Sequence, residues 1–289
     1  MTAPIRPYRS VLYIPGSKER ALEKAAGLAC DAIIFDLEDA VAAEAKVEAR
    51  ALLAKTLAST DYGQRAKIVR VNGADTEWGA DDLATICPTK PDAVLLPKVE
   101  TAAQVAAVKA ELDAAGASET QVWAMMETPR GILAAQEIAA APGMGGFVMG
   151  TNDLAKDLGT RFRADREPLL SSLQLCLLAA RAHGIVAIDG VYNAFKDDEG
   201  LREECEQGRD MGFDGKTLIH PAQLDVANEA FAPSGSEIDL ARRQIAAFEE
   251  AEANGQGVAV VDGRIVENLH VATARATLAK ADAIAAMAG

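Results

Sequence analysis

The sequence predicts an α/β protein built on a (β/α)8 barrel, with a C-terminal extension of helices and a hairpin. Eight short apolar runs alternate with helix-patterned segments, which is typical of parallel strands joined by right-handed helical crossovers. The runs at 32–35 and 93–96 are apolar throughout, as expected for strands buried on both faces. Seven of the eight runs end at or near a polar residue, and in a closed barrel these ends meet at one mouth, where active sites are built.

The elements of the barrel follow from local patterns. The expected strands cover residues 9–14, 31–36, 67–72, 92–97, 121–126, 146–150, 184–189 and 213–219. Alanine- and leucine-rich segments with charges at helical spacing predict helices between them, most clearly at 17–29, 41–58, 101–115 and 167–182. Thr101 followed by Gln104 has the spacing of a capping box.

The pattern changes after residue 233. A break at 233–236 is followed by a helical stretch to about 254, a hairpin at 257–266 that turns at Asp262-Gly263, and a last helix from about 268 to 286. We therefore divide the chain into a catalytic barrel at 1–233 and an extension at 234–289. The extension is expected to be too small for a core of its own and to pack on the barrel or on a neighbouring subunit.

The composition excludes several classes of partner. The 289 residues include 43 acidic and 29 basic side chains, and the resulting formal charge of −14 repels the phosphates of nucleic acid and the anionic face of a membrane. The four cysteines lack C-x-x-C spacing, and residues 1–7 lack the apolar segment of a secretory signal. These features predict a cytoplasmic protein that binds neither nucleic acid nor membranes.

Two acids at the ends of neighbouring strands are candidate metal ligands. Glu127 follows the run at 121–126, and Asp153 follows the run at 146–150. Carboxylate oxygens are ligands that Mg²⁺ accepts, and Mg²⁺ commonly uses only one or two protein carboxylates. The alternative is that Asp153 caps the following helix and that Glu127 forms a surface ion pair.

Arg70 lies within the apolar run at 67–72, where a lone cation is costly unless it meets an anion. A substrate carboxylate or a developing enolate oxygen is one such anion. The alternative is a structural ion pair with Asp36, Glu38 or Asp39, the three acids that follow the second strand. These acids can orient metal-bound water or hold Arg70, and the remaining alternative for them is a solvated acidic loop.

The loop after the first strand offers a weaker signal for anion binding. Residues 15–20 join the strand to a helix, and Lys18, Arg20 and Lys24 add positive charge near that helix N-terminus. The loop lacks the spacing of a Walker motif, so a solvated helix face is the default interpretation. Among the three histidines, only His220 falls at a strand end.

Six motifs occur in order along nearly the whole chain: Arg9-Ser-Val-Leu-Tyr-Ile-Pro-Gly16, Phe35-Asp-Leu-Glu-Asp-Ala-Val41, Val69-Arg-Val-Asn72, Met126-Glu-Thr-Pro-Arg-Gly131, Gly150-Thr-Asn-Asp-Leu154 and Ile219-His-Pro221. Together they resemble the citrate lyase β-subunit-like family. That family includes malyl-CoA, β-methylmalyl-CoA and citramalyl-CoA lyases, and it belongs to the Mg²⁺-dependent HpcH/HpaI aldolase superfamily.

The resemblance implies a TIM barrel in which Glu127 and Asp153 hold Mg²⁺, which Mn²⁺ can replace, and Arg70 contacts the substrate. It implies a CoA thioester and an oxo acid as the small-molecule partners. The residues at matching positions that contact substrate or CoA are Tyr13, Lys18, Lys24, Asn152 and His220. The family also forms homotrimers or homohexamers, in which the C-terminal lid of one subunit completes the site of another.

The lid contains one departure from the family pattern. The family's Gly-x-Met-Ile-Asp segment, whose aspartate is a catalytic acid/base, has become Gly263-Arg-Ile-Val-Glu267. Glu267 keeps the carboxylate but extends its reach by one methylene, and proton transfer is sensitive to such changes in position. We therefore expect Glu267 to be the catalytic acid/base, with a rim salt bridge as the alternative.

The function expected from these observations is reversible carbon–carbon cleavage of a 3-hydroxyacyl-CoA, such as malyl-CoA, into an oxo acid and an acyl-CoA. In that reaction Mg²⁺ acts as a Lewis acid, and Arg70 adds a fixed positive charge. Three alternatives are thioester hydrolysis, as in a malyl-CoA thioesterase or a malate-synthase-like enzyme, a CoA-independent pyruvate aldolase, and a noncatalytic regulatory subunit. Release of free thiol distinguishes hydrolysis from cleavage.

Overall fold

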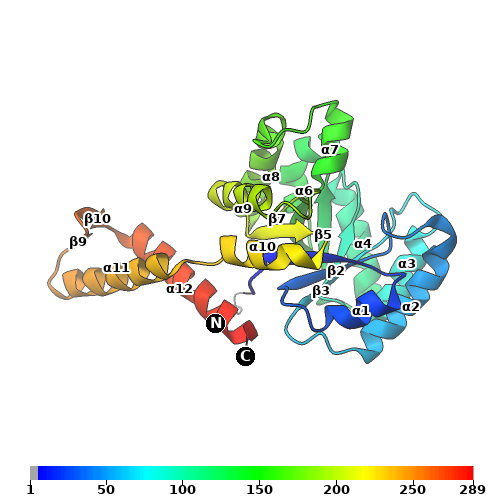
Figure 1. The fold of residues 1–289 in the computed structure, drawn as a ribbon, viewed down its shortest axis with the longest axis horizontal. Coiled ribbons are helices and arrows are strands. Elements are labelled where there is room, and N and C mark those ends of the chain that lie inside the picture. Colours follow the sequence, from blue (N-terminus) through cyan, green and yellow to red (C-terminus); the bar gives the residue numbers. More distant parts are fainter. Residues whose placement is uncertain (1–5, 289) are drawn as a thin grey trace. The chain divides into compact units, whose positions relative to one another are not determined.

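The computed structural model describes residues 6–288 and contains a closed barrel of eight parallel strands (Figure 1). The strands pair in chain order, and β8 closes the barrel by pairing with β1. Their bounds are β1 Ser10–Pro15, β2 Ala32–Asp36, β3 Ala66–Arg70, β4 Ala93–Leu96, β5 Gln121–Met126, β6 Met144–Met149, β7 Val186–Asp189 and β8 Gly215–Leu218. The predicted fold class is confirmed.

The predicted strands differ from the observed ones only at their ends. β3 ends at Arg70, two residues earlier than expected, because Asn72 leaves the sheet and its N–H group donates to Asp82. β7 begins at Val186 because Gly184, with φ of 66°, ends the preceding helix. β6 begins at Met144, where its pairing with β5 shifts register.

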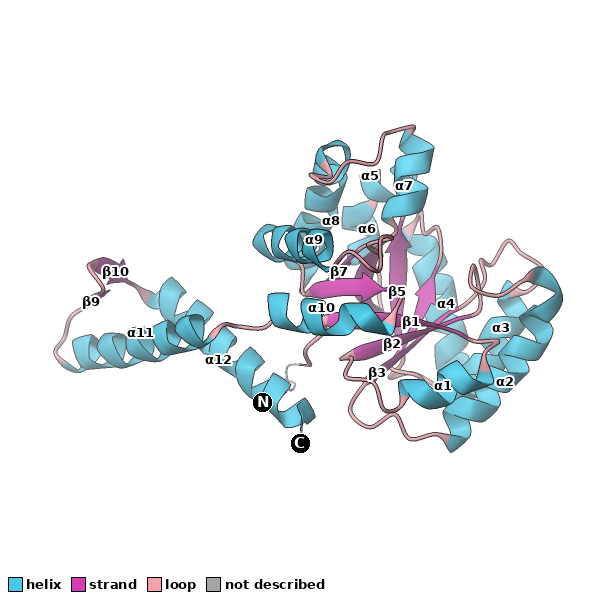
Figure 2. Cartoon of the chain, in the orientation of Figure 1, coloured by secondary structure: helices cyan, strands magenta, loops and turns pink. Residues whose placement is uncertain are grey.

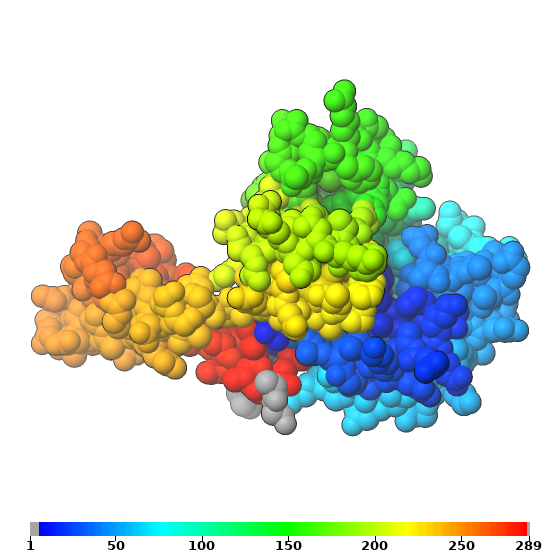
Figure 3. Space-filling model, viewed as in Figure 1, coloured from blue at the N-terminus to red at the C-terminus, as the bar shows by residue number. Residues whose placement is uncertain are grey.

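Helices surround the barrel (Figure 2). They are α1 Glu19–Ala25, α2 Lys46–Ser59, α3 Gly79–Ile86, α4 Ala102–Ala114, α5 Pro129–Leu133, α6 Ala135–Ala139, α7 Thr151–Leu158, α8 Leu170–His183, α9 Asp198–Met211 and α10 Leu224–Ala230. Short 3-10 segments lie at η1 Ala43–Ala45, η2 Cys87–Thr89, η3 Glu167–Leu169 and η4 Pro221–Gln223. The capping box of Thr101 and Gln104 is confirmed at the start of α4. Figure 3 shows α9 and α10 packed side by side on the surface of the barrel unit.

The strands are buried on both faces, as their continuous apolar character predicts. Alternate residues fill the inside of the barrel, among them Ile34, Leu95 and Trp123. The residues between them, such as Ile33 and Phe35, pack outward against the helices. Since successive side chains point to opposite faces of a strand, both faces of the sheet need apolar residues, and the barrel is a packed core rather than a pore.

One group of charges is buried between β7, β8 and α9. The side chains of Asp189 and Lys216 are completely buried, and Lys216 Nζ lies 3.1 Å from Asp189 Oδ2 and 2.6 Å from Glu204 Oε1. Arg166 Nη1 lies 2.7 Å from Asp189 Oδ2. Burial opposes ionisation of Asp189, but Lys216 and Arg166 outweigh it and hold the pKa of Asp189 below its ordinary value. The pairing therefore keeps Asp189, Lys216 and Arg166 charged.

A second compact unit begins at Ala232 and also contains Arg6 and Pro7, whereas the barrel unit spans Tyr8–Phe231. The second unit contains α11 Gly235–Ala253, the hairpin strands β9 Ala259–Val261 and β10 Arg264–Val266, and α12 Asn268–Ala288. The predicted hairpin turn is confirmed, with positive φ at both Asp262 and Gly263. The expectation that the extension lacks a core is wrong, because the two helices and the hairpin enclose a small apolar cluster: Phe248, Ala251, Ala259, Val261, Val266 and Val271.

All four cysteines are buried and unpaired with one another. In residues 6–288, no helix combines the length and apolar character that a membrane crossing requires.

Breaking the buried charge cluster should destabilise the fold. Replacing Lys216 by methionine takes one of the two cations from Asp189 and leaves Glu204 beside an apolar group. We expect the free energy of unfolding to fall by about 3 kcal/mol, which is typical when one partner of a buried ion pair is lost. The measurement is the urea midpoint at unchanged slope.

The matched control is Arg202→Met, which breaks an exposed ion pair between α9 and Glu229. That change should cost less than about 1 kcal/mol. Equal losses for the two variants would show that the Lys216 cluster contributes no more to stability than an exposed ion pair.

Candidate active site

The carboxyl ends of the barrel strands surround a pocket of about 350 Å³. Residues from β1, β2, β3 and β5 line it together with the loops after β6 and β7. The predicted residues that line it are Tyr13, Asp36, Asp39, Arg70, Glu127, Asn152 and Asp153. The barrel thus brings most of the predicted site residues to one mouth.

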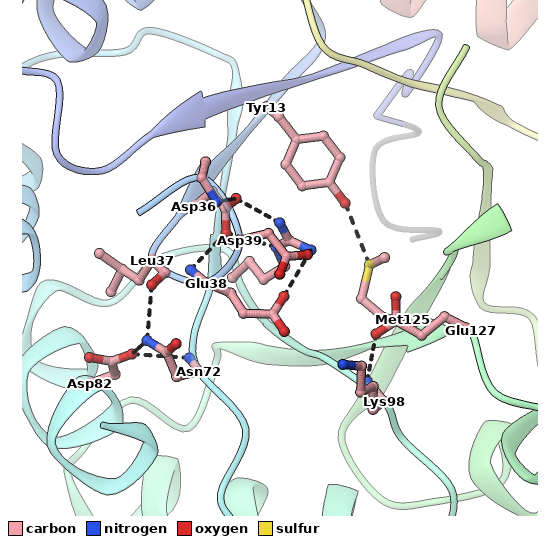
Figure 4. Close-up of polar contacts among 12 residues, drawn as sticks. Tyr13, Asp36, Leu37, Glu38, Asp39, Asn72, Asp82, Lys98, Met125 and Glu127 are labelled. Atoms are coloured by element: carbon pink, nitrogen blue, oxygen red, sulfur yellow. Dashed lines mark hydrogen bonds and ion pairs between the residues drawn. The ribbon is translucent and has the colours of Figure 1, made fainter. Parts of the chain in front are cut away.

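Glu127 is held in a narrow buried position directly after β5. It is only 3% exposed, and its Oε1 accepts a hydrogen bond of 2.8 Å from the backbone N–H of Lys98 (Figure 4). A Cβ atom at Gly150 would lie 2.4 Å from Glu127 Oε2, so glycine is required where β6 ends. Burial raises the pKa of Glu127 to about 7; the Lys98 N–H opposes the rise, and the nearby charge of Asp153 adds to it.

Asp153 lies in the first turn of α7 and is half-buried. The N-cap residue of this helix is Gly150, and no side chain caps it, so Asp153 is not a helix cap. Glu127 forms no surface ion pair, because it is buried and no lysine or arginine among residues 6–288 forms a salt bridge with it or with Asp153. Both alternatives considered for these acids are therefore wrong.

The two carboxylates fit a Mg²⁺ ion. A buried carboxylate without a cationic partner is costly, and a divalent cation would offset the charge of both acids. No group of three or more histidine, cysteine or acidic residues suited to a metal occurs in the described part of the chain, which argues against a transition-metal cage. Two hard oxygen donors at a pocket leave positions for water and substrate, as Mg²⁺ prefers.

Arg70 makes the structural ion pairs that were the alternative interpretation of this residue. Its Nε and Nη2 donate to the two carboxylate oxygens of Asp36, at 2.7 and 2.6 Å. Its Nη1 lies 2.9 Å from Glu38 and 3.3 Å from Asp39. The Tyr13 ring packs 5.0 Å from the guanidinium. Because Asp36 occupies one edge of the guanidinium, a ligand in the pocket can reach Arg70 only through its remaining N–H groups.

The acidic loop after β2 is folded around this arginine. Asp36 is 1% exposed and also accepts the N–H groups of Glu38 and Ala40, at 2.9 and 3.0 Å. Figure 4 shows Asp36, Glu38 and Asp39 lying together, with Tyr13 to one side. The side chain of Asp39 is 69% exposed, so the expectation of a solvated loop holds for Asp39 alone.

Other predicted residues lie at the edge of the pocket or outside it. Asn152 and Asn193 exchange side-chain hydrogen bonds of 3.3 and 2.9 Å at the rim. His220 does not line the pocket; its Nδ1 accepts the N–H of Ala222, and its ring lies 4.7 Å from that of Phe195. Lys18 and Lys24 are exposed near the start and end of α1, and neither lines the pocket.

Glu267 belongs to the C-terminal unit. It is exposed and directly precedes α12, where its backbone N–H donates to His270 Nδ1 at 3.0 Å. Within this chain it forms no salt bridge among the described residues, so the rim salt bridge proposed as its alternative is absent.

Three residues in or beside the pocket carried no assignment from the sequence. Lys98 follows the end of β4, and its backbone contact with Glu127 depends on a left-handed conformation with φ of 48°. Gly150 lies between a strand and a helix, and a glycine at such a position can indicate that another part of the chain packs closely against the backbone. Asn193 follows β7 in a loop with no distinctive spacing, and no sequence signal identifies it.

Comparison with known proteins agrees with this geometry. The family model described as HpcH/HpaI aldolase/citrate lyase matches residues 9–221. A (3S)-malyl-CoA thioesterase of Cereibacter sphaeroides is 69% identical over 280 residues, which is 97% of this chain and 96% of that protein. The citrate lyase subunit beta of Escherichia coli (strain K12) is 36% identical over 284 residues, 96% of this chain and 94% of that protein.

A similar solved structure is CitE from Mycobacterium tuberculosis in complex with magnesium, acetoacetate and coenzyme A. It is 34% identical, has a TM-score of 0.81, and the match covers 96% of this chain and all of that one. The expected membership of the citrate lyase β-like family is confirmed.

The expected main activity, carbon–carbon cleavage by a lyase, is wrong. Four relatives at 68–69% identity are (3S)-malyl-CoA thioesterases, which are hydrolases, whereas the citrate lyase subunits are only 35–36% identical. The residues behind the expectation do not distinguish the two reactions, because two carboxylates and an arginine suit the same acyl end of a substrate whichever bond breaks. Thioester hydrolysis, the first of the alternatives, agrees better with these relatives.

The raised pKa of Glu127 predicts how Mg²⁺ affinity depends on pH. Mg²⁺ requires the ionised carboxylate, so its affinity should rise with pH up to about 7, the pKa of Glu127, and then level off. Below pH 7 the Mg²⁺ affinity should fall about tenfold for each pH unit, because one proton competes with the metal for Glu127. The stability of the metal-free protein should depend on pH in the opposite direction. Between pH 4.5, the ordinary pKa of glutamate, and about 7, Glu127 binds more protons in the folded protein than in the unfolded chain, so the free energy of unfolding falls as pH rises.

Thermal melting with increasing Mg²⁺ at pH 5.5, 6.5 and 7.5 measures both effects. Glu127→Gln should abolish the Mg²⁺-dependent shift at every pH. Affinity that does not change with pH would remove Glu127 from the metal site.

Adding a side chain at Gly150 should displace the Glu127 carboxylate, because the new Cβ would lie 2.4 Å from Oε2. We expect Gly150→Ala to weaken Mg²⁺ binding by about tenfold or more, equivalent to at least ~1.4 kcal/mol. Gly27→Ala is the control, since the nearest atom to a new Cβ there would be the Lys24 carbonyl oxygen, at 3.8 Å. Unchanged Mg²⁺ affinity in Gly150→Ala, measured by the same thermal shift, would contradict this account of the Glu127 position.

Proposed function

Because the chain belongs to the HpcH/HpaI aldolase/citrate lyase family, we propose that it hydrolyses the thioester of malyl-CoA, or of a similar 3-hydroxyacyl-CoA, in a Mg²⁺-dependent reaction. The main support is the near full-length similarity to (3S)-malyl-CoA thioesterases at 69% identity. The pocket supports it further, because its two carboxylates and its arginine suit a substrate that carries a hydroxyl and a carboxylate. The products would be a hydroxy diacid and free CoA thiol.

Glu127 and Asp153 are the residues we propose for holding Mg²⁺. When bound, Mg²⁺ supplies a Lewis acid that polarises the substrate's oxygens and offsets their negative charge. Gly150 keeps the space for the Glu127 carboxylate, and the Lys98 N–H fixes its second oxygen. The chain thus presents the Glu127 carboxylate in one orientation before substrate binds, which reduces the cost of reorganisation during the reaction.

Arg70 and the asparagine pair would orient the acyl end of the substrate. Asp36 holds the guanidinium in place, and an N–H group of Arg70 that Asp36 does not use would contact a substrate oxygen. Removing one such preorganised donor typically costs a few kcal/mol of transition-state stabilisation. Asn152 lies at the rim, where Asn193 fixes its amide.

The CoA part of the substrate would extend from the pocket past Tyr13 toward α1. Lys18 and Lys24 are exposed there, and their charges suit the phosphates of CoA in a protein that is otherwise acidic. His220 lies outside the pocket, after β8, where its ring packs on Phe195. The four unpaired thiols suit a cytoplasmic location, where disulfides are rare.

The C-terminal unit has an apolar surface that supports assembly with further copies of the chain. Val260 and Ile265 are cross-strand partners on the outer face of the hairpin and are 65% and 61% exposed. Leu269 at the start of α12 is 62% exposed. We propose that this face packs on a neighbouring subunit of a homotrimer or homohexamer and that it brings Glu267 to that subunit's pocket.

Incubation of malyl-CoA with the protein and Mg²⁺ tests the proposed function. We expect free thiol and malate to appear in equal amounts, with no accumulation of acetyl-CoA or glyoxylate. Glu127→Gln should lower this rate at least 100-fold, because it weakens the metal site. Glu111→Gln on the exposed face of α4 is the control and should keep the wild-type rate. Acetyl-CoA and glyoxylate without thiol would contradict the proposal.

A further inference from the structure

The hydroxyl group of Tyr13 lies in the active-site pocket and is almost unused by the fold. Tyr13 is half-buried near the end of β1, and it lines the pocket. Met125 Sδ, at 3.5 Å, is the only acceptor that its hydroxyl has within residues 6–288 (Figure 4). A thioether sulfur is a weak acceptor. The phenol can therefore donate a stronger hydrogen bond to an oxygen of a bound ligand.

Packing fixes the position of this hydroxyl. Tyr13 faces the inside of the barrel, where its ring packs against the apolar cluster that contains Val11 and Ile34. The guanidinium carbon of Arg70 lies 5.0 Å from the centroid of the ring. The backbone of Tyr13 is held in register with Ile34 by the pairing of β1 with β2. Since strand and ring are both held, the hydroxyl needs little reorganisation to meet a ligand, as a preorganised donor requires.

Other donors of the pocket already have strong partners. Asn152 and Asn193 exchange side-chain hydrogen bonds of 3.3 and 2.9 Å with each other. Arg70 gives its Nε and Nη2 to Asp36, at 2.7 and 2.6 Å. Tyr13 differs from these residues because its donor meets only a sulfur. A hydrogen bond to an ionised acceptor is roughly twice as strong as one between neutral groups, so this donor gains most where negative charge develops on a ligand.

The Tyr13 hydroxyl keeps its proton near neutral pH. Burial raises the pKa of Tyr13 well above its ordinary value, and the positive charge of Arg70 opposes only part of the rise. The negative charges of Asp36 and Glu127 add to the rise. A neutral phenol donates a hydrogen bond but does not act as a base. Tyr13 is therefore suited to stabilising charge and not to accepting a proton.

The proposed function brings the thioester group of the substrate to this part of the pocket. Glu127, Asp153 and Arg70 hold the acyl end in that proposal, and the CoA arm leaves the pocket past Tyr13. All four residues line the same pocket of about 350 Å³. The thioester joins the acyl end to the CoA arm, so its carbonyl group lies between the metal site and Tyr13. The oxygen that gains negative charge during hydrolysis is the oxygen of this carbonyl group.

We propose that the Tyr13 hydroxyl donates a hydrogen bond to the thioester carbonyl oxygen and stabilises the charge that develops there. The inference rests on the proposed function, which gives Tyr13 only a place beside the CoA arm. The oxygen of water bonds to the carbonyl carbon, an electron pair moves onto the carbonyl oxygen, and one proton of that water passes to solvent. The carbon–sulfur bond then breaks with its electron pair on sulfur, which takes a proton from solvent, and the carbonyl double bond re-forms. The phenol keeps its proton throughout.

The test removes the hydroxyl alone, with Tyr13→Phe. Thiol release from malyl-CoA at saturating Mg²⁺ should show a kcat about 100-fold lower than in the wild type, the usual effect of losing one donor to a developing oxyanion. Tyr62→Phe is the matched control, because it removes a buried hydroxyl that donates to the Leu22 carbonyl oxygen at 3.0 Å and does not line the pocket. This control should lower the melting temperature but keep the wild-type kcat.

Binding of an analogue separates stabilisation of developing charge from ordinary substrate contact. The probe is a CoA thioether in which a methylene group replaces the thioester carbonyl, so that it offers Tyr13 no oxygen. Its dissociation constant, measured by calorimetry with Mg²⁺, should differ by less than about threefold between the wild type and Tyr13→Phe. The Mg²⁺-dependent melting shift and the pH dependence of kcat should also stay as in the wild type, because Tyr13 neither binds the metal nor changes its protonation.

The outcomes distinguish this inference from the proposed function. If the wild type releases no thiol, the proposed function fails. If the wild type is active and Tyr13→Phe keeps a kcat within about threefold of it, Tyr13 is not the donor. A loss of analogue affinity as large as the loss of kcat would assign Tyr13 to CoA contact and overturn the inference. Loss of the Mg²⁺-dependent melting shift in Tyr13→Phe would also overturn it, because the change would then act through the metal site.

Discussion

The bidentate ion pair between Arg70 and Asp36 is the interaction on which the rest of the site depends. It joins the ends of β2 and β3, and Asp36 uses the same two oxygens to fold the acidic loop back over the guanidinium. Burial opposes the charge of Arg70, but its hydrogen bonds to Asp36 outweigh this and raise its pKa. Without such partners, burying a guanidinium at the end of an apolar strand would cost several kcal/mol of desolvation free energy.

This arrangement also sets the charge balance of the mouth. Five carboxylates gather there against two cations, Arg70 and Lys98; the acids are Asp36, Glu38, Asp39, Glu127 and Asp153. Burial raises the pKa of both Glu38 and Glu127 to about 7, and the excess of negative charge around them adds to the rise. It also makes the pocket attractive to a divalent cation and unattractive to an anion that arrives without one.

The sequence was sufficient for the fold and for much of the pocket. Apolar runs at strand length and polar residues at their ends follow from short-range physics, so all eight strands and the mouth could be predicted. The partner of Arg70 could not be chosen, because a substrate and a neighbouring acid satisfy the same charge. The burial of Glu127 could not be predicted either, because it depends on the close approach of Gly150 and on the backbone of Lys98. The activity was predicted wrongly for a related reason. The motifs identify residues that suit the acyl end of a substrate, whereas the choice between hydrolysis and carbon–carbon cleavage depends on where water binds and where protons are transferred. The one sequence signal for a changed outcome was Glu267 in place of aspartate.

The buried cysteines have a consequence for a protein whose proposed product is a thiol. Burial raises the pKa of Cys30 to about 11 and those of Cys176 and Cys205 to about 12, and it raises the pKa of Cys87 as well. Only a thiolate attacks a disulfide, and these sulfurs are both protonated and shielded. The folded chain is thus inert toward oxidised CoA, and mixed disulfides between the protein and CoA would not accumulate as turnover proceeds.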